Sequence, residues 1–289
     1  MSKINPDFCN REYNNRERVP GHEVLHEKRV AQSVKIRASG IGRLDIAYGS
    51  SPNERLDFFP AAAPGGPLLV FIHGGYWRSR SRTEYAWLAP PYLAQGINVA
   101  LIDYDLAPAV SIDTIVLQTL RALEWLWRAA DEQGFDASRI HVAGHSAGGH
   151  LVAMAMSALW PRWDPDLPAD LVKGGIAISG IYDLEPLVHA SFVNQDLKLD
   201  NKSAFRLSPA WMPPATQAPL ITCVGGEESS EFLRQTRLLA ARRKPVLRAD
   251  VPAPGRNHFT VLDALADPGH ALFRQTVALC RGKLVANDP

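Results

Sequence analysis

The pentapeptide Gly144-His145-Ser146-Ala147-Gly148 places a serine between two glycines, after an apolar stretch and before a helical one. This is the G-x-S-x-G pattern of a sharp strand-to-helix turn, which lifts a serine hydroxyl out of a sheet. The positive end of the following helix dipole would favour negative charge that develops near this hydroxyl. The pattern therefore predicts a nucleophilic Ser146, against the plain alternative of a glycine-rich turn with an incidental serine.

A second glycine-rich segment, His73-Gly74-Gly75-Tyr76-Trp77, follows the first strongly apolar run of the chain. A serine hydroxyl that attacks a carbonyl creates a tetrahedral oxyanion, and this oxyanion needs hydrogen-bond donors. Two glycines let the backbone come close to a substrate carbonyl. We therefore predict an oxyanion hole made by the N–H groups of Gly75, Tyr76 and Ala147. Taken alone, the segment would be a tight turn whose aromatic residues belong to the core.

The serine also needs a base. With a serine at such a turn, the acid and the histidine follow it along the chain in that order. Of the nine histidines, only His258 and His270 lie beyond the last predicted strand. His258 stands in the loop directly after that strand, whereas His270 comes after a further short helical segment, so we prefer His258 as the base.

Two adjacent glutamates, Glu227 and Glu228, follow the penultimate predicted strand, where the acid is expected. Adjacent side chains point in different directions, so only one of them can hold the imidazole. We prefer Glu228 and keep Glu227 as the alternative. The acid would hold the tautomer of His258 and stabilise its imidazolium without taking the proton itself.

The segment His22-Glu23-Val24-Leu25-His26 matches H-E-x-x-H, a zinc protease pattern. On a helix the two histidines would share a face and could bind zinc. The segment is polar, directly follows Pro20-Gly21 and has no evident third ligand nearby. We therefore expect a solvated helical turn here, with no metal and no organic cofactor.

Alternating apolar strands and helices surround these motifs and predict an α/β fold, with a mostly parallel central sheet and helices on both faces. In such sheets ligands bind beyond the carboxyl ends of the strands, which is where the motifs fall. The predicted strands are 34–38, 44–48, 56–59, 68–72, 97–104, 140–142, 176–179, 220–224 and 246–251. The predicted helices are 112–130, 147–159, 230–243 and 273–284. Residues 1–31 are polar and irregular, and we expect them to form an arm or cap on a single domain of residues 32–289.

Composition limits the class of partner. The chain has 289 residues, of which 46% are hydrophobic and 21% charged, and a net charge of +1, as in an ordinary globular protein. This charge disfavours a nucleic-acid or membrane-surface partner, and no apolar run is long enough to span a membrane. We expect a small-molecule substrate and leave a homodimer open. Three widely spaced cysteines and an N-terminus without an apolar signal segment predict a cytoplasmic protein.

Together these segments resemble the kynurenine formamidase (arylformamidase) branch of the α/β-hydrolases, which adjoins the hormone-sensitive-lipase-like esterases. The resemblance runs from about residue 13 to residue 259 and is most specific at the serine turn and at residues 73–77. Supporting segments are residues 12–16, 47–49, 55–60, 104–108, 179–184 and 228–232. It implies the α/β-hydrolase fold and an acid at position 228, where many members have aspartate and this chain has Glu228.

The resemblance also implies the reaction, which is hydrolysis of an N-formylated aromatic amine such as N-formylkynurenine through an acyl-enzyme. Candidate aromatic walls for this substrate are Tyr76, Trp77, Phe192 and Trp211, each of which could equally be a core residue. A carboxylesterase, amidase or carbamate hydrolase acting on small aryl or short-acyl substrates is the alternative. A peptidase is disfavoured because there is no room for an added gating domain. A non-catalytic binding protein is disfavoured because serine, histidine and acid are all present.

Overall fold

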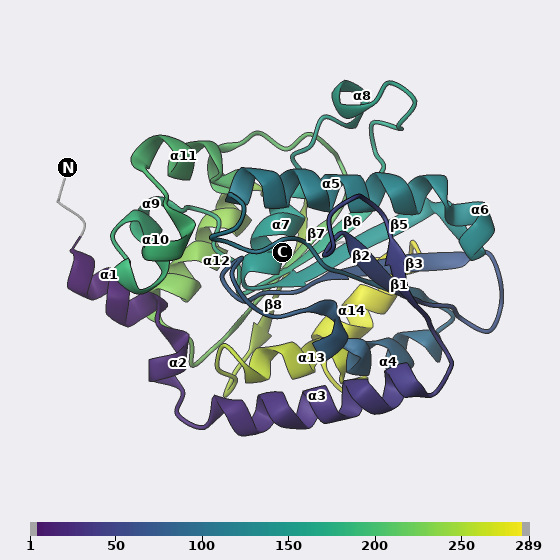
Figure 1. The fold of residues 1–289 in the computed structure, drawn as a ribbon, viewed down its shortest axis with the longest axis horizontal. Helices are drawn as coiled ribbons and strands as arrows, with labels where there is room; N and C mark the ends of the chain where they lie inside the picture. Colours follow the sequence, from purple (N-terminus) through teal and green to yellow (C-terminus); the bar gives the residue numbers. More distant parts are fainter. Residues whose placement is uncertain (1–4, 285–289) are drawn as a thin grey trace.

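An eight-stranded sheet runs through the centre of the computed structural model, which describes residues 5–284 (Figure 1). The strands are β1 (Arg43–Ala47), β2 (Arg55–Phe59), β3 (Gly66–Ile72), β4 (Asn98–Ile102), β5 (Phe135–His145), β6 (Gly174–Ile178), β7 (Leu220–Gly225) and β8 (Leu247–Ala253). Their order across the sheet is β1-β2-β4-β3-β5-β6-β7-β8. β1 pairs with β2 and β2 with β4 antiparallel, and all other pairs are parallel. The predicted mostly parallel sheet is confirmed.

The central strands are apolar runs that are buried on both faces. β3, β4 and β6 are buried almost throughout, as expected for parallel strands covered by helices on both sides. Side chains alternate between the faces, so Val70 and Ile72 belong to one core cluster and Leu69 and Phe71 to the other. The sheet therefore has two separate cores, and its loops meet at one edge, beyond the carboxyl ends of the parallel strands.

Helices cover both faces of the sheet. In Figure 1, α5 (Ile112–Arg128), α7 (Ala147–Ala155) and α12 (Ser230–Arg242) lie on one side, and α4 (Ala89–Leu93), α13 (Asp263–Ala266) and α14 (Ala271–Cys280) on the other. The remaining α-helices are α1 (Pro6–Tyr13), α2 (Asn15–Arg18), α3 (His22–Ala38), α6 (Ala130–Gln133), α8 (Trp160–Trp163), α9 (Glu185–Val188), α10 (Ser191–Leu197) and α11 (Asn201–Arg206). Short 3-10 helices are η1 (Arg82–Glu84), η2 (Ala86–Leu88), η3 (Pro209–Trp211) and η4 (Thr260–Leu262).

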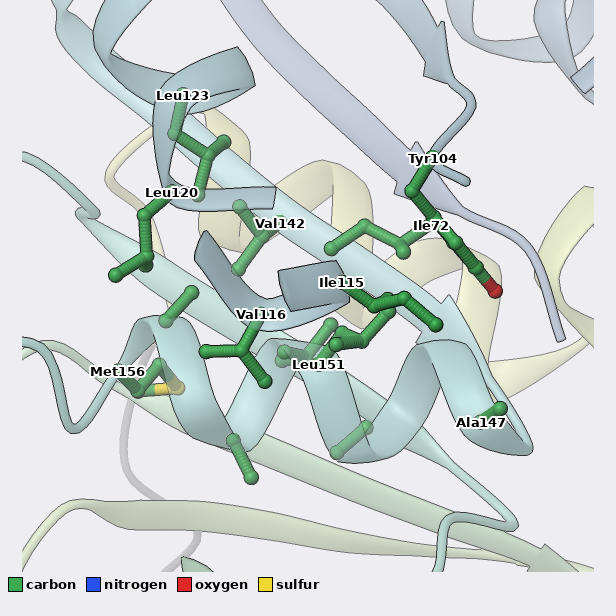
Figure 2. Close-up of a cluster of buried hydrophobic side chains, with 14 of the residues drawn as sticks. Ile72, Tyr104, Ile115, Val116, Leu120, Leu123, Val142, Ala147, Leu151 and Met156 are labelled. Atoms are coloured by element: carbon green, nitrogen blue, oxygen red, sulfur yellow. The ribbon is translucent and has the colours of Figure 1, made fainter. Parts of the chain in front are cut away.

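One of the two cores lies under α5 and α7. Figure 2 shows side chains of these helices meeting those of β3 and β5, among them Ile72, Ile115, Val116, Leu120, Leu123, Val142, Leu151 and Met156. α7 begins directly after the serine turn, so this packing holds the turn at the edge of the sheet.

The N-terminal segment differs from its prediction. Residues predicted to be irregular are helical from Pro6, and α3 continues through residues 34–38, which we predicted as a strand. The buried positions of α3 are His22, Arg29 and Ser33, while Val24 and Val34 are 71% and 59% exposed. The helix therefore buries polar groups and exposes apolar ones, which removes the hydrophobic periodicity that identifies an amphipathic helix.

The N-terminal helices are tied to the rest of the fold by polar contacts. Arg29 pairs with Asp263 and also donates to the carbonyl oxygen of Phe259 at 3.0 Å. The Ser33 hydroxyl accepts a hydrogen bond from the N–H of Trp87 at 3.2 Å. We call residues 5–38 the arm. Its attachment explains why buried positions on α3 carry charge or hydroxyl groups.

Cys9, Cys223 and Cys280 are all buried and form no disulfide. Within residues 5–284, no helix combines the length and apolar character needed to cross a membrane.

Candidate active site

Ser146 stands at the turn between β5 and α7 with a φ of 57° and a ψ of −121°, a conformation that costs energy for a non-glycine residue. Its N–H donates to the carbonyl oxygen of Ile178 on the neighbouring strand at 2.9 Å. A Cβ at Gly144 would lie 2.3 Å from the oxygen of Gly148, and one at Gly148 would lie 2.0 Å from that of Ile72. The two glycines are therefore needed for steric reasons.

His258 and Glu228 reach the same place from the loops after β8 and β7. The Nε2 atom of His258 lies 3.1 Å from the Oγ atom of Ser146. The Nδ1 atom of His258 lies 2.6 Å from the Oε2 atom of Glu228. All three side chains are buried. The structure thus brings together the three residues proposed as nucleophile, base and acid, although 112 residues separate the serine from the histidine.

The two alternatives for base and acid lie elsewhere. The ring of His270 caps α14 by accepting a hydrogen bond from the N–H of Leu272 at 3.1 Å. Glu227 is exposed, and its backbone N–H donates to the oxygen of Arg256 at 3.0 Å. Neither is hydrogen-bonded to the serine or to His258.

Glu228 is held on its other oxygen. The Oε1 atom accepts hydrogen bonds from the hydroxyl of Ser179 and from the N–H of Gly225, the latter at 2.8 Å. Oε2 is thereby left to His258. Ser179 follows β6 and was absent from our sequence-based candidates, because a serine after a strand carries no pattern that links it to an acid 49 residues later.

The imidazole of His258 is packed between other rings. It lies 4.4 Å from the ring of Phe232 and 4.7 Å from that of His145. The Nε2–H of His145 donates to the carbonyl oxygen of His258 at 2.8 Å. Burial lowers the pKa of His145 well below its ordinary value, so this ring stays neutral. His145 therefore holds the loop of His258 without competing for the proton.

The segment after β3 turns sharply beside the serine. Gly75 has a φ of 105°, and a Cβ there would lie 2.3 Å from the oxygen of Ser79. Within the described chain, the N–H groups of Gly75, Tyr76 and Ala147 donate to no other residue. Three donors without partners near Ser146 are what an oxyanion would require.

A buried ion-pair network supports this segment. The Nε2 atom of His73 lies 3.0 Å from an oxygen of Asp103, which also accepts hydrogen bonds from Arg82 and from the hydroxyl of Ser81. Burial alone would raise the pKa of Asp103, but His73 and Arg82 hold it below its ordinary value. The carboxylate therefore stays charged and fastens the loop to the end of β4.

A pocket with a volume of about 100 Å³ opens at Ser146. Its lining residues are Asn14, Asn15, Arg16, His22, His26, Arg29, Gly74, Gly75, Tyr76, Arg78, Ser79, Arg80, Glu84, Tyr85, Trp87, His145, Ser146, Phe192, His258, Phe259 and Leu262. The first six come from the arm, which sequence reasoning had not connected with the site. No motif in the arm could have shown this, because the contact depends on how α2 and α3 are docked.

Of the four aromatic residues expected to line the substrate site, two do so. Tyr76 and Phe192 are in the pocket wall, with ring centroids 5.7 Å apart and planes at 90°. Trp77 is 0% exposed and packs against His150 in the core, 5.0 Å away. Trp211 is 41% exposed and lies under Arg242, outside this pocket. The structure does not bring these two tryptophans to the site.

The H-E-x-x-H segment also lies beside the pocket. His22 is buried and stacks on Phe259 with a centroid distance of 4.4 Å, so the expected solvated turn is wrong for this residue. His26 faces Arg80 and lies 3.5 Å from Glu84. Among residues 5–284, no three His, Cys, Asp or Glu side chains are placed to share a metal ion. Burial, and then Arg80, lowers the pKa of His26 to about 4.

Known proteins resemble this chain in sequence. A family model described as the alpha/beta hydrolase fold matches residues 69–248. Kynurenine formamidase from Salmo salar is 30% identical over 250 residues, which is 82% of this chain and 82% of that protein. The enzyme of the same name from Danio rerio is 31% identical over 242 residues, 80% and 79% of the two chains. Esterase LipC from Mycobacterium tuberculosis is 29% identical over 77% of this chain and 61% of its own length.

Solved structures also resemble this chain. A protein from Silicibacter sp. tm1040 that is provisionally called a thioesterase matches with a TM-score of 0.82 and 31% identity, covering 94% of this chain and 98% of its own. The carboxylesterase EstE1 matches with a TM-score of 0.67 at 22% identity, which supports the fold alone. The family model and the two formamidases show that the chain belongs to the α/β-hydrolases, in their kynurenine formamidase-like branch, and is a hydrolase.

Proposed function

We propose that the protein is a serine hydrolase that cleaves the formamide bond of an N-formylated aromatic amine such as N-formylkynurenine. The observation that carries this proposal is the continuous hydrogen-bonded chain from Ser146 through His258 to Glu228 at the floor of a pocket. The similarity to two kynurenine formamidases supports the choice of bond. The three buried cysteines without a disulfide fit a cytoplasmic location for this activity.

In the first half of the reaction, the Oγ atom of Ser146 attacks the formyl carbon while Nε2 of His258 takes the hydroxyl proton. The carbonyl oxygen becomes an oxyanion, which the free N–H groups of Gly75, Tyr76 and Ala147 stabilise. The C–N bond then breaks, and His258 gives its proton to the departing amine nitrogen. The product is an aromatic amine, and a formyl ester remains on the serine.

In the second half, water replaces the amine. His258 takes a proton from this water as its oxygen attacks the formyl ester. The bond between the formyl carbon and the oxygen of Ser146 breaks, and His258 returns the proton to the serine, which releases formate. Glu228 stays ionised throughout and stabilises the imidazolium. Every step uses groups of this chain and water.

The pocket also supports an aromatic leaving group. Tyr76 and Phe192 meet edge to face and form an apolar wall near the serine. The hydroxyl of Tyr76 donates to the backbone oxygen of Tyr13, so its ring is held from the arm. An aromatic ring held in this way offers an aryl substrate contact at low entropic cost.

A carboxylesterase or a related amidase or carbamate hydrolase, acting on small aryl or short-acyl substrates, is the second candidate. The 29% identity to esterase LipC favours it, and the same three residues would cleave an ester by the same steps. An ester has a better leaving group, so weak esterase activity is expected even of a formamidase.

Steady-state kinetics separate the two. Wild-type protein is assayed with N-formylkynurenine, by formate release, and with p-nitrophenyl acetate and butyrate. We expect kcat/KM for the formamide to exceed that for both esters. A kcat/KM for the formamide at least 100-fold below that for either ester would reject the formamidase and favour the carboxylesterase.

A further inference from the structure

Four arginines line the pocket that contains the serine. Arg16 comes from α2 and Arg29 from α3, so both belong to the arm. Arg78 and Arg80 come from the loop after β3. The single carboxylate among the lining residues is Glu84. The wall is therefore rich in positive charge, although the chain as a whole carries only +1.

Three of these arginines are already paired within the protein. Arg29 pairs with Asp263, and Arg78 pairs with Asp196. Arg80 lies 3.5 Å from Glu84 and also contacts His26. Glu23 is a further carboxylate beside the pocket and lies 3.0 Å from His22.

Arg16 is different. Within residues 5–284, no carboxylate lies within 4.0 Å of its guanidinium group, and no hydrogen bond joins that group to another residue. The side chain is exposed on the pocket side of the arm. Partial burial against the pocket wall, and then Arg80 and Arg78, lowers the pKa of Arg16, while Glu23 acts in the opposite direction. An arginine remains charged despite such a shift, so an unbalanced cation stands at the pocket.

Within residues 5–284, no carboxylate pairs with this cation, although the charge of Glu23, which lies 3.0 Å from His22, also acts on Arg16. The pKa of His26 is lowered to about 4, so His26 is neutral near pH 7. The carboxylate of Glu84 is shared between Arg80 and His26. A guanidinium group beside two others is unfavourable by itself and becomes favourable when an anion joins it. An arginine can hold a carboxylate through two parallel N–H donors.

The cationic group and the aromatic wall are joined. Arg78 donates to the backbone oxygen of Phe192 at 2.9 Å, and its guanidinium carbon lies 5.9 Å from the centre of that ring. Phe192 in turn packs against Tyr76. A ligand that rests on this wall can therefore carry a negative group toward the arginines.

We propose that Arg16 binds a carboxylate of the substrate, so that the pocket selects aromatic formyl or acyl compounds carrying a negative charge away from the reacting bond. Arg78 and Arg80 strengthen the attraction without forming the direct contact. This inference rests on the proposed function, because it describes which substrates that same site prefers. Arg16 is thus a specificity-determining residue and takes no part in breaking the bond.

Two substrate pairs test the inference. Formanilide and 4-formamidophenylacetate share the formamide bond and differ by one carboxymethyl group. Phenyl acetate and 4-acetoxyphenylacetate form the matching ester pair. The measured quantity is the ratio of kcat/KM for the anionic member to kcat/KM for the neutral member. We expect this ratio to fall roughly 10- to 100-fold in Arg16→Gln, mostly through KM, as for the loss of a charged hydrogen bond.

Arg18→Gln is the matched control. Arg18 lies two residues away on the same helix, pairs with Glu12 at 3.7 Å and is outside the pocket lining. The Arg18→Gln substitution removes the same charge from the arm, and the ratio of kcat/KM values for the anionic and neutral substrates should stay within about twofold of wild type. The KM of the anionic substrates should also rise with added salt, because salt screens attraction between exposed charges.

The outcomes separate this inference from the proposed function. An unchanged ratio in Arg16→Gln, or an equal fall in Arg18→Gln, would overturn the role of Arg16. A wild type that hydrolyses the esters but releases no formate from either formamide or from N-formylkynurenine would overturn the formamidase proposal. In that case a fall of the ester ratio in Arg16→Gln would still support the carboxylate site.

Discussion

The edge of the sheet and the arm contribute to the same pocket in different ways. Ser146, Glu228 and His258 follow β5, β7 and β8, and all three are buried. The arm contributes polar residues from α2 and α3, and its Arg16 is exposed. The family model matches residues 69–248, which include the serine and the acid but not the arm.

This difference indicates that the sheet edge and the arm have different roles. Parallel strands place their carboxyl ends side by side, so residues distant in sequence meet with little freedom. The arm docks from outside through polar contacts, such as those of Tyr13 with Glu231 and Gln235 on α12. Changes at the sheet edge should therefore lower kcat, whereas changes in the arm should alter substrate preference or stability.

The largest effect is expected at the serine. Ser146→Ala should reduce kcat by about a millionfold, because residues that act as a unit lose nearly all their effect when one is removed. Formate release or p-nitrophenol release measures the loss. Ser138→Ala, at an exposed position near the other end of β5, is the control and should retain wild-type kcat. Retention of more than a few per cent of the activity in Ser146→Ala would reject the serine as nucleophile.

The two glutamates should differ strongly. Glu228→Gln should lower kcat by roughly 100- to 10,000-fold, since an amide in place of this carboxylate favours the wrong tautomer of His258. Glu227→Gln should change kcat less than about threefold, because Glu227 is exposed. Measurement of kcat for the two variants under the same conditions shows which glutamate is the acid. A larger loss of kcat in Glu227→Gln than in Glu228→Gln would identify Glu227 as the acid.

Removing a contact of the arm should lower the stability of the protein. The hydroxyl of Tyr13 donates to Glu231 at 2.7 Å and accepts from Gln235 at 2.8 Å. Tyr13→Phe removes one hydrogen bond from each of these two buried partners, while Glu231 keeps its bonds from Arg234 and Gln235 keeps its bond to the oxygen of Asp183. The free energy of unfolding should therefore fall by about 1–3 kcal/mol. Urea denaturation measures the fall. A change below about 0.5 kcal/mol would mean that this contact does not hold the arm.

Lowering the pH tests whether the arm and the sheet unfold together. Burial lowers the pKa of His141 on β5 to about 4, and burial followed by Arg80 does the same for His26 on α3. An ordinary histidine has a pKa near 6.5, so the unfolded chain binds more protons between about pH 4 and 6.5. Stability is therefore complete above this window and falls within it by about 1.4 kcal/mol per pH unit for each histidine.

His141→Asn and His26→Asn should each reduce this pH slope, as measured by urea denaturation at several pH values. Equal reductions would show that the arm unfolds in the same step as the sheet. A reduction in His141→Asn alone would show that the arm detaches first. If neither variant alters the slope, the pKa shifts do not contribute to folding.

Sequence reasoning located the parts of the molecule that follow simple patterns. β3 and β4 are nearly continuous apolar runs, and their predicted positions agree with the structure to within two residues. The predicted strand at 140–142 was too short, since β5 begins at Phe135 with polar residues that carry no strand pattern. The mostly parallel sheet and the helices on both faces were predicted correctly.

Other features depend on packing that no local pattern records. The choice between Glu227 and Glu228 rests on which side chain turns inward after β7. Trp77 and Trp211 have the aromatic side chains expected of a substrate wall, but Trp77 lies in the core and Trp211 on the surface. The arm's contribution to the pocket requires the docking of α3, whose buried face is polar. The catalytic roles of Ser146 and His258 stay predictions until they are measured.

Covalent labelling tests the central claim most directly. Wild-type protein is treated with a fluorophosphonate, and the adduct is located by intact mass and peptide mapping. The account predicts one adduct, on the peptide that contains Ser146, and no adduct in Ser146→Ala. An adduct on another residue, or equal labelling of Ser146→Ala, would contradict it.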